Sequence, residues 1–489
     1  MTTACLPKND ALLVRVKSEM LHDSKASVAF RFSYPTGRHA DDANDWDQPS
    51  RHQSVLLSNN AHDAVIERRL DSTTYYIYIR WEGNATLQEC DRHHFELSTT
   101  DDVLAFEAEY LSKPRKQGST TPRLVYDQQL RAVMKHWNAF WKSGAVVDFS
   151  QCTDSRAAEL ERRVVLSQYL TQVNCANRFP PQETGLTYNS WFGRPHLEMT
   201  WWHMVHFSLW NRPQPLRQVL DWYGDVAYAE AKAIARRQGF DGIRWMKMTD
   251  PWAAEAPSNT GSFLIWQQPH YIYMAEEAYR SDPSAKTLEQ YARFVDETAA
   301  FMADFVSKDK KTGLYFLRGA TSMQESMSKD FSFNHPFELA YWQYGLSVAQ
   351  QWRERQGKPR DAKWDDIINH LSSLSDKNGI YQAALPVKPF RRDAASTQFD
   401  PFTSREQQES KEISEDDFLM KSRSDHPAVL GVCGMLPCHG SHPLYDASVM
   451  KNTLDWVLEN WNWPTTWGWD YGMIAMAAAI STNNDLEKI

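Results

Sequence analysis

The pattern of helical segments is the feature that most restricts how this chain can fold. From about residue 123 onward, apolar residues recur at helical spacing in eleven segments, most of them in adjacent pairs separated by long loops. Helices that bury their apolar faces against one another form layered or ring-shaped folds. Six pairs close an α/α toroid, so eleven segments predict an (α/α)6 toroid that apparently lacks its last helix. The segments have no short-period repeat of the kind that marks a regular solenoid.

Residues 10–110 have a different pattern, with short β-branched or aromatic segments in partial alternation. This is typical of antiparallel strands packed as a small β-sandwich. We therefore expect a mainly α protein with a β-sandwich-like domain at 1–115, a linker at 116–124 and the toroid at 125–489. The charged segment 391–425 is expected to be a surface loop, with a functional lid as the alternative.

Composition excludes several classes of function. A net charge of −9 over 489 residues argues against nucleic acid as a partner. No apolar run approaches the roughly 20 residues that cross a bilayer, so we expect no membrane association. The N-terminus does not resemble a signal peptide, and the six cysteines form no CxxC pair. These features favour unpaired thiols in a reducing compartment, and we expect a cytoplasmic protein.

One segment combines aromatic and hydrogen-bonding residues in a way that a simple core helix does not require. It is the stretch 191–210, WFGRPHLEMTWWHMVHFSLW. Sugars stack their C–H faces on indole rings and need donors and acceptors for their hydroxyls, so this mixture favours a carbohydrate site. A buried helix with satisfied polar residues is the alternative. His196, His203 and His206 lack a convincing third ligand, and we expect neither a metal nor a cofactor.

Three further segments, 239–270, 320–342 and 461–473, have the same character. Cleavage of a glycosidic bond needs a carboxylic acid for the leaving oxygen and a second carboxylate, or an external anion, on the other face. The four segments supply such carboxylates among aromatic residues. The residues predicted to contact substrate are Trp191, Arg194, Glu198, Trp201, Trp202, His203, Trp245, Lys247, Trp266, Gln267, Gln268 and His335.

The ordered motifs resemble those of a known superfamily. The motifs are HLEMTWWHMVHFSLWNR, FDGIRWMKM followed by LIWQQPHYIYMAE, MQE followed by FNHPFELAYW, and WGWDYGMIAMAA. Over roughly residues 125–480 they resemble the six-hairpin glycosidase superfamily, and glycoside hydrolase family 65 and its relatives most of all. The resemblance implies a β-sandwich before an (α/α)6 barrel and inverting hydrolysis or phosphorolysis of α-glucosides. It also implies that Glu325 is the general acid, with a solvated loop carboxylate as the plain alternative.

The second catalytic group is less well defined by the motifs. No glutamate matches the position where hydrolases of that family activate water, and Asp470, at a predicted helix start, is the leading candidate. Glu198 is the alternative base, or it binds substrate hydroxyls. The β region is shorter than the family's sandwich, and the last barrel helix is absent from the pattern.

The predicted function is inverting hydrolysis of a short α-linked glucoside or similar glycoside, with exo-action if loops close the pocket. The alternatives are a glycoside phosphorylase, and a non-catalytic glycan-binding protein or truncated fragment. The expected partner is a carbohydrate substrate, and a homodimer is kept open.

Overall fold

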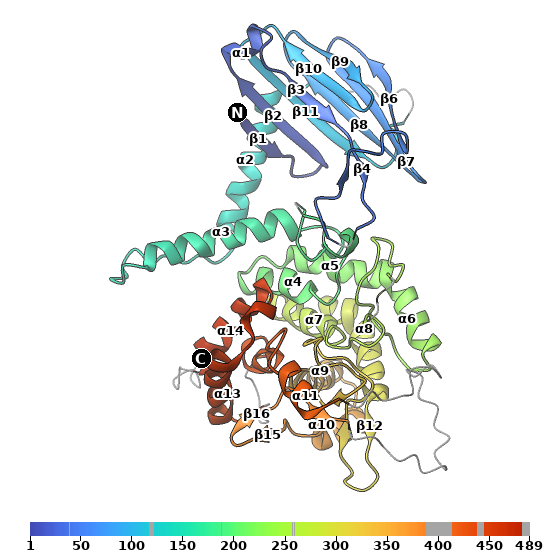
Figure 1. Cartoon of the computed structure of the whole chain (residues 1–489), viewed down its shortest axis with the longest axis vertical. Helices are drawn as coiled ribbons and strands as arrows, with labels where there is room; N and C mark the ends of the chain where they lie inside the picture. The colour runs from blue at the N-terminus through green and yellow to red at the C-terminus, as the bar shows by residue number, and fades with distance from the viewer. Residues whose placement is uncertain are drawn as a thin grey trace. The chain divides into compact units, whose positions relative to one another are not determined.

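The computed structural model describes residues 1–38, 40–116, 122–186, 188–256, 258, 260–387, 413–437 and 445–481 (Figure 1). Contacts divide the chain into two compact units, one of residues 1–146 with 188–192 and one of 147–187 with 193–489. The first unit consists mainly of strands and the second mainly of helices, which confirms the predicted fold class. Most of the predicted loop 391–425 lies outside the described residues.

The first unit is a sandwich of two antiparallel sheets. The larger sheet has the order β1-β2-β11-β8-β7-β6 and the smaller one β3-β10-β9. Their bounds are β1 Thr2–Cys5, β2 Ala11–Lys17, β3 Val28–Arg31, β6 His52–Asn59, β7 Asp63–Leu70, β8 Thr73–Trp81, β9 Ala85–Asp91, β10 His94–Thr99 and β11 Val103–Leu111. The short helix α1 (Glu19–His22) and the strand pair β4 (Tyr34–Pro35) and β5 (Asn44–Asp45) complete the sheet region.

Alternation of buried and exposed residues explains why the two sheets pack face to face. In β10, Phe95, Leu97 and Thr99 are buried while the residues between them are partly exposed. Phe95 and Leu97 join Ile77 and Trp81 of β8 in one apolar core, and the Trp81 indole N–H donates to the Ala61 carbonyl at 3.1 Å.

Helix α2 (Tyr126–Lys142) clusters with the sandwich unit. The sequence interpretation assigned these residues to the toroid, so the contact division differs from the predicted boundary near residue 125. The buried Tyr126 packs with Leu13 of β2 and Leu124 in a small apolar cluster, which ties the start of the helix to the sheet.

The second unit contains paired helices. Their bounds are α3 Ala157–Cys175, α4 Thr200–Leu209, α5 Gln214–Trp222, α6 Tyr228–Arg237, α7 His270–Ser281, α8 Ala285–Phe305, α9 Pro336–Arg355, α10 Ala362–His370, α11 Glu415–Lys421, α12 Gly431–Gly434, α13 Ala447–Asn460 and α14 Gly468–Ser481. A π-helical turn, Tyr223–Ala227, joins α5 to α6. The short strand pairs are β12 Ser307–Lys308 with β13 Tyr315–Phe316, β14 Ser332–Phe333 with β17 Leu385–Pro386, and β15 Asp376–Lys377 with β16 Ile380–Tyr381.

Five helices of this unit line its centre in chain order. Helix α4 contacts α7, α7 contacts α9, α9 contacts α12, and α12 contacts α14. The ring closes because Trp202 of α4 lies with its ring centroid 5.4 Å from that of Trp469 of α14. We call α4, α7, α9, α12 and α14 the inner helices. The predicted absence of a last helix concerns the chain after Ser481, which lies outside the described residues.

Local sequence explains several helix starts. Ser284, Asp361 and Asp446 accept backbone N–H groups at the beginnings of α8, α10 and α13, as expected for N-cap residues. Within the part of the chain that the structure describes, no helix has the length and apolarity needed to span a bilayer.

Candidate active site

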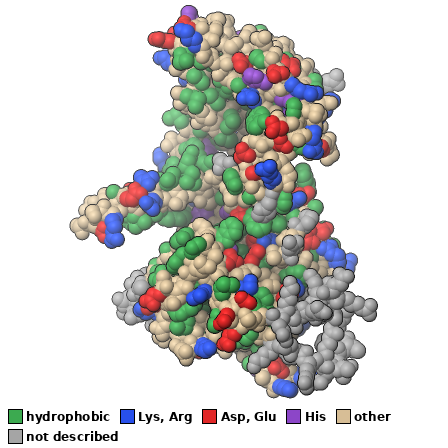
Figure 2. Space-filling view, viewed as in Figure 1, with side chains coloured by type: hydrophobic (Ala, Val, Ile, Leu, Met, Phe, Trp, Pro, Cys, Tyr) green, Lys and Arg blue, Asp and Glu red, His purple; other side chains and the backbone are tan. Residues whose placement is uncertain are grey.

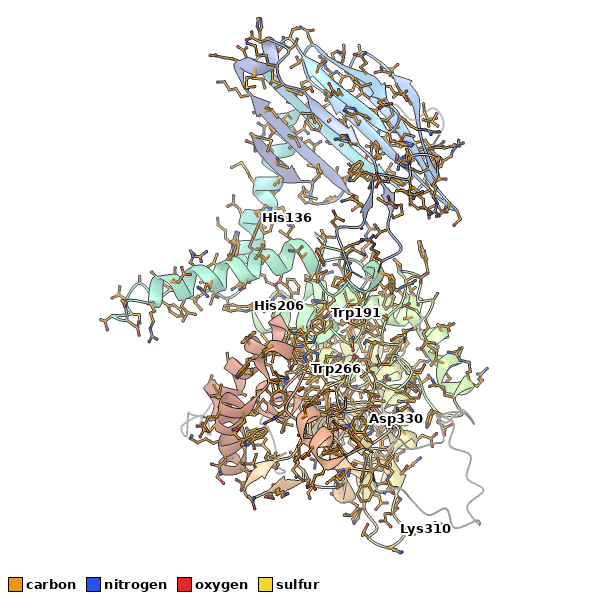
Figure 3. All side chains as sticks on the ribbon, in the orientation of Figure 1. His136, Trp191, His206, Trp266, Lys310 and Asp330 are labelled. Carbon is orange, nitrogen blue, oxygen red and sulfur yellow. The ribbon has the colours of Figure 1, made fainter. Side chains whose placement is uncertain are left out.

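The candidate site lies at the N-terminal ends of the inner helices. Glu198 precedes α4, Trp266 precedes α7, Glu325 precedes α9, His426 precedes α12, and Asp470 lies in the first turn of α14. Figure 3 shows Trp266 within the helical unit. Helix N-termini carry partial positive charge, so this end of the ring favours ionised carboxylates.

Lys247 joins the two glutamates that the sequence singled out. Its ammonium Nζ lies 2.7 Å from Glu325 Oε1 and 3.3 Å from Glu198 Oε1, and its side chain is 1% exposed. Burial lowers the pKa of Lys247, but the two carboxylates outweigh burial and the pKa is raised, so the lysine is charged. Three residues from separate loops therefore form one cluster, in which Lys247 and Glu198 are buried and Glu325 is partly exposed.

The two glutamates of this cluster have opposite pKa shifts. Burial raises the pKa of Glu325, an effect that Lys247 only partly offsets and that the nearby Glu198 reinforces. Burial also opposes ionisation of Glu198, but Lys247 and His196 outweigh it and lower the pKa of Glu198. Divergent pKa values in a pair of carboxyl groups are typical of an acid and an ionised partner.

Glu198 is held rigidly by its neighbours. Its Oε2 accepts the indole N–H of Trp266 at 3.2 Å, and its Oε1 lies 3.2 Å from His196 Nε2. Its backbone carbonyl contacts His270 Nε2 at 2.8 Å, and His270 Nδ1 contacts the Tyr341 hydroxyl. This carboxylate is fixed in place and ionised.

Asp470 belongs to a second polar group, built around His426. Its Oδ1 lies 2.8 Å from His426 Nδ1, and its Oδ2 accepts the Trp467 backbone N–H at 2.7 Å. The Asp470 side chain is 0% exposed, so it has no oxygen open to a water molecule. The predicted direct role of Asp470 as the base therefore has no support in its geometry, and Asp470 instead orients the imidazole of His426.

His426 connects Asp470 to the loop that carries Glu325. Its Nε2 lies 3.5 Å from Asp425 Oδ1, and Asp425 Oδ2 accepts the Ser326 backbone N–H at 3.0 Å, one residue from Glu325. Burial lowers the pKa of His426, but Asp470 and Asp425 outweigh it and the pKa is raised. The imidazole is therefore poised to hold or release a proton close to Glu325.

Aromatic rings border these polar groups. Trp469 lies with its centroid 4.2 Å from the His426 ring and 6.4 Å from Trp266, to which it is nearly parallel at 19°. Trp202 contacts Trp469 and meets Trp201 edge to face at 4.9 Å. Flat indole faces beside carboxylates are what a sugar ring requires.

Several predicted substrate contacts lie inside the protein core. Trp245 is 0% exposed, and its indole N–H donates to Thr298 Oγ1 at 3.1 Å, so no ring face is open for stacking. Gln268 bonds the backbone N–H and carbonyl of Trp245, and Gln267 donates to the Trp245 and Leu264 carbonyls. These contacts hold the loop that carries Lys247.

The remaining predicted residues have separate positions. His203 is buried against the Glu183 carbonyl at 3.2 Å, and burial lowers its pKa to about 4. His335 is buried against Ser332 Oγ at 2.9 Å, and burial lowers its pKa to about 3. Arg194 is half-buried. Trp191 clusters with the sandwich unit, and its stacking role stays a prediction.

Sequence reasoning missed His426, Asp425 and His196 as site residues. The signal for the first two was an Asp-His pair directly before Pro427, which begins the approach to α12. Among the described residues, no three His, Cys, Asp or Glu side chains gather in a way that could hold a metal ion.

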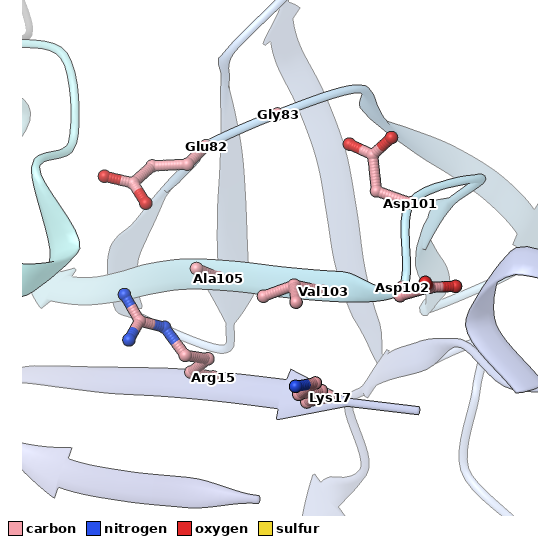
Figure 4. Close-up of a pocket in the computed structure, with 8 residues that line it drawn as sticks. All are labelled: Arg15, Lys17, Glu82, Gly83, Asp101, Asp102, Val103 and Ala105. Atoms are coloured by element: carbon pink, nitrogen blue, oxygen red, sulfur yellow. The ribbon is translucent and has the colours of Figure 1, made fainter. Parts of the chain in front are cut away.

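A pocket of about 470 Å³ in the sandwich unit is a weaker candidate (Figure 4). Two of its charged side chains already have partners within the protein. Arg15 pairs with Asp127 at 2.7 Å, and Glu82 accepts the Tyr126 backbone N–H. The residues that line it are Arg15, Lys17, Glu82, Gly83, Asp101, Asp102, Val103 and Ala105.

Comparison with known proteins establishes the architecture. No protein-family model and no curated protein matches the sequence. Among solved structures, the chain resembles a protein described as a kojibiose phosphorylase from the human microbiome, with a TM-score of 0.60 and 11% sequence identity. The match covers 98% of this chain and 63% of that one, so the chain spans less than two thirds of its neighbour's length. At this identity the likeness shows the fold alone: an antiparallel sandwich followed by a helical toroid.

Proposed function

We propose that this protein cleaves a glycosidic bond with inversion and that Glu325 is its general acid. The observation that carries the proposal is the contact of Lys247 with both Glu198 and Glu325, in which the pKa of Glu325 is raised while that of Glu198 is lowered. A carboxyl group with a raised pKa keeps its proton to a higher pH and can donate it to a leaving oxygen. The Glu325 side chain is 31% exposed, so it remains accessible to a substrate.

The neighbouring groups support binding of a sugar. Glu198 is ionised and fixed, so its oxygens suit hydroxyl donors of a sugar ring. Trp469 and Trp202 offer partly exposed ring faces for stacking. Lys247 and His196 together favour ionisation of Glu198, so Glu198 and Glu325 differ in how readily they ionise.

Water is the first candidate for the attacking group. In this reaction Glu325 protonates the glycosidic oxygen, the bond from that oxygen to the anomeric carbon breaks, and water attacks the carbon from the opposite face. In its neutral form, His426, oriented by Asp470, takes the proton of the attacking water at Nε2 and becomes the imidazolium. Asp470 thus keeps a catalytic contribution that acts through His426, as a positioning residue.

Phosphate is the second candidate, and His426 favours it. Its raised pKa favours the imidazolium form, and such a cation can hold an oxyanion. The structural neighbour's description as a phosphorylase agrees with this reaction. Against it, the group around His426 contains two carboxylates, Asp425 and Asp470, which repel a phosphate.

The substrate class rests on the sequence resemblance. We propose a short α-linked glucoside or similar glycoside, processed from its end, by a protein that works in the cytoplasm. A glycan-binding protein without turnover would need the same aromatic residues and none of the proton chemistry of Glu325.

The test is a panel of α- and β-linked disaccharides, incubated with and without inorganic phosphate, with the released sugars separated by chromatography. Release of free sugar without phosphate supports hydrolysis, and a sugar phosphate formed only with phosphate supports phosphorolysis. NMR of the first product distinguishes inversion from retention. Binding of a disaccharide without any turnover would refute the catalytic proposal.

The acid is tested with Glu325→Gln, which keeps the shape and removes the proton. We expect turnover to fall by roughly 10²–10⁴-fold while substrate binding is largely retained. Asp330→Asn is the matched control, because Asp330 lies in the same loop and pairs at the surface with Lys329. A Glu325→Gln variant as active as this control would remove Glu325 from the mechanism.

A further inference from the structure

The loop that carries Glu325 is fastened on both sides of that residue. The Gln324 side chain donates from Nε2 to the backbone carbonyls of Lys421 and Ser424, at 3.0 and 2.9 Å. The Ser326 hydroxyl donates to the same two carbonyls, at 3.0 Å each. The residues directly before and after Glu325 therefore bind one shared pair of acceptors.

These two acceptors lie at the C-terminal end of α11. Lys421 is the last residue of the helix, and Ser424 lies three residues beyond it. Carbonyl groups at a helix C-terminus lack partners within the helix, so side chains from elsewhere can satisfy them. In the described structure every residue of α11 is at least partly exposed, and acidic and hydrophobic side chains show at the surface where α11 lies (Figures 1 and 2). The contacts at its end are thus a main attachment of this helix.

The turn after α11 is itself fixed to the segment before α14. We call residues 422–425 the anchor turn. The Trp461 indole N–H donates to the Asp425 carbonyl at 2.9 Å, and the Asp425 backbone N–H donates to Thr465 Oγ1 at 2.8 Å. Since the anchor turn is fixed, it can hold the loop of Glu325 in one place.

The anchor turn leads directly into His426. Asp425 Oδ2 accepts the Ser326 backbone N–H at 3.0 Å, while Asp425 Oδ1 lies 3.5 Å from His426 Nε2. The charge of Glu325 is also among those that raise the pKa of His426, so the two groups are close enough to interact. One short turn thus adjoins one candidate catalytic group and fastens the loop of the other.

We propose that Gln324 and Ser326 are positioning residues that set the place of the Glu325 carboxyl relative to His426. The proposal rests on the function proposed above, in which Glu325 protonates the leaving oxygen and His426 serves the attacking group. Groups on opposite faces of a sugar ring need a defined separation. A misplacement of about 1 Å can cost about 10²-fold in rate, and the loop cannot shift without breaking its bonds to the two carbonyls.

The position of Glu325 also affects its ionisation. Burial is the largest cause of its raised pKa, Glu198 and Asp425 reinforce it, and Lys247 opposes it. If the loop is released, the carboxyl gains contact with water and its pKa should fall towards the ordinary value. A purely structural role of Gln324 would not change this pKa.

The substitution Gln324→Ala tests the proposal, because it removes both amide donors. We expect kcat to fall by roughly 10- to 100-fold with little change in KM. The basic limb of the pH profile of kcat should move to lower pH, since Glu325 loses its proton more readily. Gln350→Ala is the matched control: Gln350 is a buried glutamine towards the other end of α9 that likewise donates to a backbone carbonyl, that of Asp361, at 2.7 Å.

Ser326 is tested with a pair of variants. Ser326→Ala should lower kcat by about tenfold, whereas Ser326→Thr keeps the hydroxyl and should retain most of the activity. Circular dichroism and melting temperature check that all variants fold. Equal losses of kcat in Gln324→Ala and Gln350→Ala, or an unchanged pH profile in Gln324→Ala, would overturn the proposal. A loss in Ser326→Thr as large as in Ser326→Ala would remove Ser326 from it.

A titration of Glu325 by NMR separates this proposal from the proposed function. The protein is labelled at the carboxyl carbon of glutamate, and the Glu325 signal is identified by its absence in Glu325→Gln. Gln324→Ala should lower the pKa of Glu325, and Gln350→Ala should leave it unchanged. A wild type that cleaves no glycoside would refute the proposed function, while the titration would still decide the positioning. An unchanged Glu325 pKa in Gln324→Ala would refute the positioning whether or not the protein is active.

Discussion

Removal of the Lys247 ammonium should destabilise the protein in a pH-dependent way. The substitution Lys247→Met keeps the length of the side chain but leaves Glu198 and Glu325 close together in the protein interior without the cation that joins them. At an effective dielectric constant of about 20, the attraction between the Lys247 ammonium and the Glu198 carboxylate, which lie 3.3 Å apart, is about 5 kcal/mol. Since removal of the lysine also removes its own desolvation cost, we expect a net loss of about 3 kcal/mol at pH 8.

The sign of the pH dependence follows from the pKa of Glu198. In the wild type this pKa is lowered, so the stability from Glu198 is present above its unfolded value and is lost as pH falls through the folded value. Without Lys247, burial and Glu325 raise the pKa of Glu198 above the unfolded value. The variant then binds more protons when folded, and its stability falls as pH rises. The difference from wild type is therefore largest at pH 8 and smaller at pH 5.

The assay is urea unfolding followed by tryptophan fluorescence at pH 5 and pH 8. Lys451→Met is the control, because Lys451 and Asp455 form an exposed pair at 2.7 Å whose loss should cost at most about 0.5 kcal/mol at either pH. A deficit for Lys247→Met that is the same at both pH values would refute the argument. So would a deficit no larger than that of the control.

Two further predictions concern the His426–Asp470 pair of the site and His52 of the sandwich. His426→Gln and Asp470→Asn should each lower turnover by roughly 10²-fold or more. Because the two side chains act as a unit, the double variant should be no less active than His426→Gln. Additive losses in the kinetics of the three variants would contradict the pairing. In the sandwich, burial together with His93 and Arg68 lowers the pKa of His52 to about 4, and Arg68 donates to its Nδ1 at 2.8 Å. As pH falls, the unfolded state therefore binds the proton before the folded state does, so stability should fall as pH drops from about 6.5 to 4. The substitution His52→Gln should flatten this part of the profile of melting temperature against pH. An unchanged profile would show that His52 does not titrate there.

The sequence was sufficient for the parts of the site that depend on local pattern. Glu198, Lys247, Trp266 and Glu325 occur in segments that mix aromatic and charged residues just before apolar helical runs, and all four meet at the N-terminal ends of the inner helices. Because those ends lie together in a ring of helices, residues that precede different inner helices are brought close in space.

Burial could not be predicted in the same way. Trp245 and Gln268 have the residue types of a sugar site, yet they bond one another through side chain and backbone within the core. The contact of His426 with Asp470 joins residues 44 positions apart, and no local pattern specifies it.

The contact between Trp202 and Trp469 closes the ring of inner helices, and the site is complete only while this ring is closed. Each inner helix contributes a different group, so no single pair of helices carries the chemistry, and Trp469 both completes the ring and contacts His426. Trp469 and Asp470 both belong to α14, so we expect opening of α14 from α4 to move both residues away from Trp202 and His426. Under the proposed function, we expect loss of turnover to report this local opening before any global unfolding signal.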